Sequence, residues 1–278
     1  MNKKAWFWIL AVVITASTAL YQRMTGPTYE KEVRFQIENE EYITQLPRSH
    51  DGTDSCGIEL PIPASVKGIL FYKRYPTDED WSSTPFRESK NGQIAYLPGQ
   101  PPAGKLQYFI GLRTSKRIIY IARHDPLIIR FKGEVPTGIL IPHVAVMFLA
   151  MLFSTVAGLF ALGKIPNYRI YGYITIILLI IGGFILGPTM QYHAFGDAWT
   201  GIPFGWDLTD NKTLIAFIGW LTAILSNRKK NRPRHYVVAA VLLLIVYSIP
   251  HSLLGSEYDY EKGEVTTGFI SLFMEALL

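Results

Sequence analysis

Residues 138–162 read GILIPHVAVMFLAMLFSTVAGLFAL, a run without a charged side chain that is long enough to cross the hydrocarbon core of a bilayer as one helix. The composition of the chain differs on the two sides of this run. Residues 33–132 mix charges, prolines and β-forming side chains, whereas apolar runs separated by short polar loops follow residue 138. The sequence therefore predicts an integral membrane protein whose main domain boundary lies near residue 137.

Four more apolar segments are candidate membrane spans, at residues 5–20, 170–187, 213–225 and 236–249. The last two reach about twenty residues only if their polar or aromatic flanks are counted, which helices packed against neighbours tolerate. The first segment also suits a signal peptide, because two lysines precede it and small residues end it. Trp6 and Trp8 resemble an interfacial aromatic belt and favour a retained anchor.

Basic residues in the short loops orient these spans. Lys3 and Lys4, Lys164 and Arg169, and the five basic residues within 228–234 all fall on one side, which predicts that this side is the cytoplasm. The β-rich region, the 188–212 loop and the C-terminus are then extracytoplasmic, and the expected location is a bacterial inner membrane. The net charge of +5 is explained by these loops, so no nucleic-acid partner is predicted.

The predicted domains are an N-terminal transmembrane anchor or signal peptide at 1–24, an extracytoplasmic β-sandwich at 25–136, a four-helix transmembrane domain at 137–255 and an extracytoplasmic tail at 256–278. Residues 266–278 are too short to span a bilayer and are expected to form an interfacial helix. The single cysteine, Cys56, excludes an intramolecular disulfide framework.

Short segments of strand composition occur at 33–37, 68–72, 106–110, 118–121 and 127–131, at intervals typical of a β-sandwich. Residues 94–110 read IAYLPGQPPAGKLQYFI and resemble the strand, Pro/Gly turn and strand of many bacterial immunoglobulin-like and fibronectin-type-III-like domains. The resemblance implies an immunoglobulin-like sandwich whose role is to bind a partner or to act as a spacer. Independently, the period-two alternation places Leu106, Tyr108 and Ile110 toward the core.

Residues 193–212 read HAFGDAWTGIPFGWDLTDNK, which is dense in glycine, aromatic and acidic side chains. This segment resembles that of an uncharacterised bacterial integral membrane protein family with an extracytoplasmic immunoglobulin-like domain. The resemblance implies the same architecture and carries no catalytic role to any residue.

Three histidines, His143, His193 and His251, are placed near the outer face by the predicted orientation. Neutral imidazole is a common ligand of zinc, copper and haem iron, so these residues are candidate ligands of a metal ion or haem. Acidic residues in the same layer are candidates to complete the set of metal ligands, namely Asp197, Asp207, Asp210 and Glu257. The alternative is that the histidines are interfacial and that the acids before the fourth span cap its helix.

The sequence favours a non-enzymatic membrane accessory or binding subunit, which uses its β-domain and its transmembrane bundle to dock with other membrane or periplasmic proteins and with lipids. One alternative is a membrane redox or metal- or haem-binding module with an outward-facing histidine cluster. A second alternative is a component of a small-solute transporter, which is disfavoured because no charged residue lies deep inside a predicted span.

Overall fold

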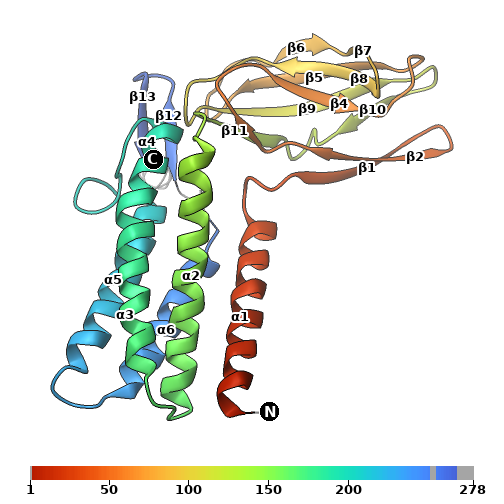
Figure 1. The fold of residues 1–278 in the computed structure, drawn as a ribbon. Helices are drawn as coiled ribbons and strands as arrows, with labels where there is room; N and C mark the ends of the chain where they lie inside the picture. Colours follow the sequence, from red (N-terminus) through yellow and green to blue (C-terminus); the bar gives the residue numbers. More distant parts are fainter. Residues whose placement is uncertain (1, 251–254, 268–278) are drawn as a thin grey trace. The chain divides into compact units, whose positions relative to one another are not determined.

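The computed structural model of the chain describes residues 2–250 and 255–267 and has two compact units (Figure 1). Unit 1 comprises Met1–Pro27, Val135–Ser256 and Thr267–Leu278, and unit 2 comprises Thr28–Glu134 and Glu257–Thr266. All the described helices belong to unit 1, and the strands are concentrated in unit 2. The predicted combination of apolar helices with β-sheets is confirmed at this level.

The helices of unit 1 are α1 (Lys3–Thr25), α2 (Thr137–Leu162), α3 (Tyr168–Leu179), the π-helical segment η1 (Ile180–Leu186), α4 (Gly187–Phe195), α5 (Leu208–Ser226) and α6 (Pro233–Ser248). Helices α3 and α4 are joined through η1 into one continuous helix from Tyr168 to Phe195.

Among the described residues, three helices are long and apolar enough to cross a membrane: Lys3–Thr25, Thr137–Leu162 and Tyr168–Phe195. This agrees with the membrane prediction but not with the count of five spans. Helix α6 is apolar but has only 16 residues, and α5 begins with the polar sequence LTDNKT, which dilutes its apolar run.

Small residues let the helices of unit 1 approach closely. A Cβ atom added to Gly158 of α2 would lie 2.5 Å from the Cβ of Ala240 in α6, and one added to Gly172 of α3 would lie 2.3 Å from Cε1 of Tyr236. Such close backbone approach is how helices gain packing energy in a membrane, where the lipid is as apolar as the side chains.

The strands are β1 (Lys31–Ile37), β2 (Glu40–Leu46), β3 (Ser49–Asp51), β4 (Cys56–Leu60), β5 (Lys67–Arg74), β6 (Ser82–Pro85), β7 (Arg87–Ser89), β8 (Gly92–Leu97), β9 (Lys105–Arg113), β10 (Ile118–Ile121), β11 (Leu127–Lys132), β12 (Ser256–Asp259) and β13 (Glu264–Thr267).

The larger sheet has the strand order β3-β11-β9-β5-β6, and β10 pairs with β9 as well. Strands β10 and β11 follow each other along one edge of β9, since β10 pairs with residues 110–113 and β11 with residues 105–108. Only the β3 to β11 pairing is parallel in this sheet. The smaller sheet has the order β4-β8-β7, and β1-β2 and β12-β13 are two-stranded ribbons.

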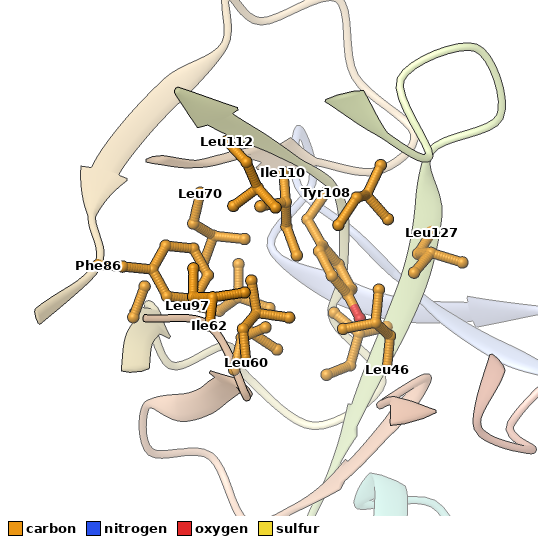
Figure 2. Close-up of a cluster of buried hydrophobic side chains, with 14 of the residues drawn as sticks. Leu46, Leu60, Ile62, Leu70, Phe86, Leu97, Tyr108, Ile110, Leu112 and Leu127 are labelled. Atoms are coloured by element: carbon orange, nitrogen blue, oxygen red, sulfur yellow. The ribbon is translucent and has the colours of Figure 1, made fainter. Parts of the chain in front are cut away.

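Both sheets contribute to one hydrophobic core (Figure 2). Leu60 of β4 and Leu97 of β8 come from the smaller sheet, and Leu106, Tyr108 and Ile110 of β9 come from the larger one. The predicted inward orientation of the three β9 residues is confirmed, because each is buried. The hydroxyl group of Tyr108 donates to the carbonyl oxygen of Pro47 at 2.8 Å, so its polar atom is satisfied inside the core.

The described part of the C-terminal tail, residues 256–267, forms the β12-β13 hairpin, most of which belongs to unit 2. The interfacial helix expected at 266–278 lies almost entirely outside the described residues, which end at 267. The turn explains the hairpin locally, because the Asp259 carboxylate accepts from the amides of Glu261 and Lys262 at 2.9 and 3.1 Å. Gly263 then adopts a φ of +74°, which glycine favours.

Candidate functional site

His143 lies on α2 and contacts the π-helical segment of the neighbouring helix. Its Nδ1–H donates to the carbonyl oxygen of Gly182 at 3.0 Å, and the backbone amide of Gly187 donates to the same oxygen. Because η1 interrupts the regular α-helical bonding pattern, the imidazole supplies a side-chain partner to the backbone there. This contact gives His143 a structural role at the junction of two helices.

The other histidine candidates are not brought together with His143 in the described residues. His193 is exposed on the last turn of α4, and its ring lies beside that of Tyr192 at a centroid distance of 6.2 Å. Asp197 is exposed in the following loop, and His251 lies outside the described residues. Within residues 2–250 and 255–267, no three His, Cys, Asp or Glu side chains are arranged to hold a metal ion.

Asp207 is the N-cap of α5. Its Oδ1 accepts from the amide of Thr209 at 2.7 Å, and its Oδ2 accepts from the hydroxyl of Ser256 at 3.3 Å. The carboxylate therefore satisfies one of the free amides at the start of the helix, as the capping alternative predicts.

Asp210 fastens the loop before α5 to the first turn of that helix. Its Oδ2 accepts from the amides of Thr200 and Gly201 at 2.7 and 3.0 Å, and from the side-chain amide of Gln191 at 3.2 Å. Gly201 is needed for this approach, because a Cβ atom there would lie 2.6 Å from the Cβ of Asp210. These contacts identify Asp210 as a structural anchor of the 196–207 loop.

Lys212 is buried two residues further along α5. Its Nζ donates to the carbonyl oxygen of Ile249 at 2.7 Å and to that of Pro250 at 3.4 Å. A cation at this position satisfies carbonyls that the end of α6 leaves without helical partners. The polar residues 207–212 thus hold the loop and two helix ends together.

Glu257 belongs to unit 2, whereas the histidine candidates belong to the sequence ranges of unit 1. Its Oε1 forms an ion pair with Nζ of Lys105 at 2.8 Å, and the two side chains retain only 9% and 21% of their exposure. Burial lowers the pKa of Lys105, and the carboxylate of Glu257 opposes that effect. Glu257 is therefore part of the β-rich unit and attaches β12 to β9.

A groove of about 460 Å³ opens on unit 2 beside this ion pair. Its lining combines aromatic, proline and charged side chains from β5, the β5–β6 loop, the β8–β9 turn and the C-terminal hairpin, with Tyr72, Arg74, Glu79, Pro98, Tyr258 and Tyr260 as examples. The groove brings together segments that are far apart in the sequence.

Tyr260 closes one wall of the groove. Its phenol oxygen accepts from the amide of Lys105 at 3.0 Å and its hydroxyl donates to Oε1 of Gln100 at 2.8 Å. The Arg74 guanidinium lies 5.1 Å from the centre of the Tyr260 ring and forms an ion pair with Glu79. Burial raises the pKa of Tyr260 to about 12, so its hydroxyl is neutral at physiological pH.

The groove does not follow from the sequence, because the pattern of residues 256–278 predicts a tail. The available signal was the turn around Gly263 between two short segments of strand composition, SEYD and EVTT. That signal predicts a hairpin but not the sheet against which the hairpin packs.

Comparison of the chain with known protein families, with curated proteins and with solved structures found no match.

Proposed function

We propose that this chain is a non-enzymatic accessory or binding subunit of a bacterial inner membrane, whose β-rich unit binds a partner protein in the groove beside the C-terminal hairpin. The groove carries the proposal. Its volume of about 460 Å³ is in the range of small-molecule pockets, which is room for side chains of a partner, and its lining holds aromatic rings, prolines and paired charges. Tyrosine and arginine are among the residue types that are enriched at the strongest contacts of protein interfaces.

The strand order supports an immunoglobulin-like sandwich for this unit. In such domains one sheet contains the order B-E-D and the other the order C-F-G. The β4-β8-β7 sheet corresponds to B-E-D and the path β5-β9-β11 corresponds to C-F-G. Immunoglobulin-like domains serve many unrelated functions, so the binding role rests on the groove and not on the fold.

The membrane part of the proposal rests on the three long apolar helices and on the basic loops. In the proposed topology α5 and α6 also span the membrane. The N-terminus is cytoplasmic and the β-rich unit is extracytoplasmic. Basic residues 228–234 connect α5 to α6 and supply the strongest cytoplasmic signal. Lipids and a membrane or periplasmic protein are then the partners.

The groove is tested by removing one aromatic wall from the full-length chain. Tyr258→Ala widens the groove, and Tyr96→Ala removes an exposed tyrosine from β8 of the other sheet as a matched control. Tagged chains are cross-linked in cells, purified in detergent, and their co-purified membrane and periplasmic proteins quantified. The proposal expects a partner that Tyr258→Ala loses and Tyr96→Ala retains. Equal recovery with both variants would reject the groove as the binding site.

A further inference from the structure

The outward face of the larger sheet carries a second surface, which adjoins the groove lining where Nζ of Lys73 lies 5.6 Å from the centre of the Trp81 ring. Pro85, Ile69, Gly111 and Tyr120 are direct neighbours across β6, β5, β9 and β10. Successive side chains of a strand point to opposite faces of the sheet. Leu70, which follows Ile69 in β5, is buried in the core, so Ile69 and the rest of this row point outward.

Aromatic rings pack together on this outward face. Phe71 and Phe109 are cross-strand neighbours whose rings stack at 4.7 Å, and the Trp81 ring meets Phe109 edge-on at 4.7 Å. Gly111 leaves room for this packing, since a Cβ atom there would lie 3.2 Å from the Phe71 ring and 3.4 Å from that of Tyr120. The surface is therefore formed in advance of any binding.

The side chains around the buried centre of this face are exposed. Phe109 retains 8% of its exposure, whereas Ile69, Trp81 and Tyr120 retain 39%, 39% and 43%. Ile118, on the outward side of β10, is also exposed. A contiguous apolar patch on one sheet face is a feature of interaction sites.

The charged residues of β5, β9 and β11 are all basic, and β6 and β10 carry no charge. Asp51 of β3, at the edge of the larger sheet, pairs with Lys132 of β11 at 2.7 Å. Lys67 and Arg113 are exposed cross-strand neighbours, and like charges in that position destabilise a sheet. No ion pair to either residue occurs within the part of the chain that the structure describes. An anion placed between them would relieve the repulsion.

We propose that this β5–β9 face, defined by Lys67, Ile69, Phe71, Phe109, Arg113 and Tyr120, is a second docking surface that binds a protein presenting an apolar centre with an acidic rim. The exposed isoleucines favour a protein over a sugar or phosphate polymer, because they gain only from burial against apolar side chains. Charge disfavours a second copy of the chain, which would bring the same basic residues together. Binding to a bilayer is an outcome that the test distinguishes, because Ile69, Trp81 and Tyr120 are exposed.

The test places a photo-crosslinking amino acid at position 69 of the full-length chain in living cells. The proposal expects an adduct with one protein, mapped by mass spectrometry to a segment that contains aspartate or glutamate. Lys67→Glu with Arg113→Glu should reduce the adduct by at least ~10-fold, because like charges across an interface repel strongly. Arg87→Glu with Lys90→Glu makes the same change in net charge at the smaller sheet and should leave the adduct unchanged.

Several outcomes would overturn this proposal. These are an adduct with a second copy of the chain, an adduct that survives charge reversal at Lys67 and Arg113, the absence of an adduct, or binding of the detergent-purified chain to phosphatidylglycerol vesicles through the same residues. Unchanged melting of the charge-reversed chain shows that it is folded. The adduct at position 69 should persist in Tyr258→Ala, so that failure of the groove and failure of this face are distinguished.

Discussion

Lys105 and Glu257, 152 residues apart in the sequence, form an ion pair at 2.8 Å between the first residue of β9 and strand β12. The pair is reinforced by the amide of Tyr258, which donates to the carbonyl oxygen of Ala103 at 3.2 Å. The C-terminal hairpin is therefore integrated into the β-rich unit by both charge and backbone contacts.

Removing one member of this pair should loosen the hairpin. Glu257→Gln leaves the mostly buried ammonium group of Lys105 without its counter-charge, at an expected cost of about 2 kcal/mol. Hydrogen exchange of the amides in 256–267, followed by mass spectrometry on the full chain, should then be roughly 30-fold faster.

The double variant Lys105→Met with Glu257→Leu is the control for this prediction. It removes both charges together and should recover most of the protection, because an apolar pair leaves no buried charge. If the double variant exchanges as fast as Glu257→Gln, other contacts of Glu257 account for the loss.

Alkaline pH should weaken the same hairpin through Tyr260. Its pKa rises to about 12 on folding, above the ordinary value of about 10, so the folded state favours the neutral hydroxyl. The resulting stabilisation is fully present below about pH 10 and is lost as the pH rises through about 12. The difference in melting temperature between the wild type and Tyr260→Phe should therefore shrink from pH 9 to pH 11.5. A constant difference over this range would show that Tyr260 stays neutral in both the folded and the unfolded state, or that its hydroxyl is already free of contacts in the folded state.

Asp210 should hold the 196–207 loop, whereas Asp197 should not. Asp210→Ala removes an acceptor of two backbone amides and should destabilise the loop by about 3 kcal/mol, since hydrogen bonds to a charged group are strong. Chymotrypsin should then cut faster at the exposed Phe204 or Trp206 in detergent. Asp197→Ala, in the same loop but exposed, should be cut at the wild-type rate. Equal cleavage of the two variants would contradict the anchoring role.

Helix packing in unit 1 should depend on Gly158. Gly158→Ala places a methyl group 2.5 Å from the Cβ of Ala240 and should destabilise the protein by about 1–3 kcal/mol, as overpacking does. Melting in detergent measures the change. Gly138→Ala is the matched control, because an added Cβ there meets nothing within 4 Å. Gly158→Ala combined with Ala240→Gly should restore stability, and no restoration would mean that the two helices do not meet at these residues.

The elements that follow from local composition were predicted well from the sequence. The apolar run at 138–162 became α2, and the alternation at Leu106, Tyr108 and Ile110 points into the core. The predicted span at 170–187 is shorter than the helix in the structure, which continues to Phe195. Proline is tolerated in the first turn of a helix, and after η1 it lies in the first turn of α4.

The pairings between distant segments could not be predicted in the same way. Nothing in the local pattern around Glu257 identifies Lys105 as its partner, and a helix was expected for part of that tail. The contacts of Asp210 depend on the loop that returns to it, so its bonds to the amides of Thr200 and Gly201 could not be predicted from the local sequence. The outward face of the larger sheet required the strand register, which one sequence does not supply.

The position of the hairpin has a consequence for the order of synthesis. Residues 28–134 leave the ribosome long before Glu257, and the helical segments α2 to α6 are made between them. During that interval Lys105 has no counter-charge and the wall formed by Tyr260 does not exist. The groove can therefore form only after Tyr258 and Tyr260 have been translated, so a chain that stops before them displays the β-strands without that part of the groove lining.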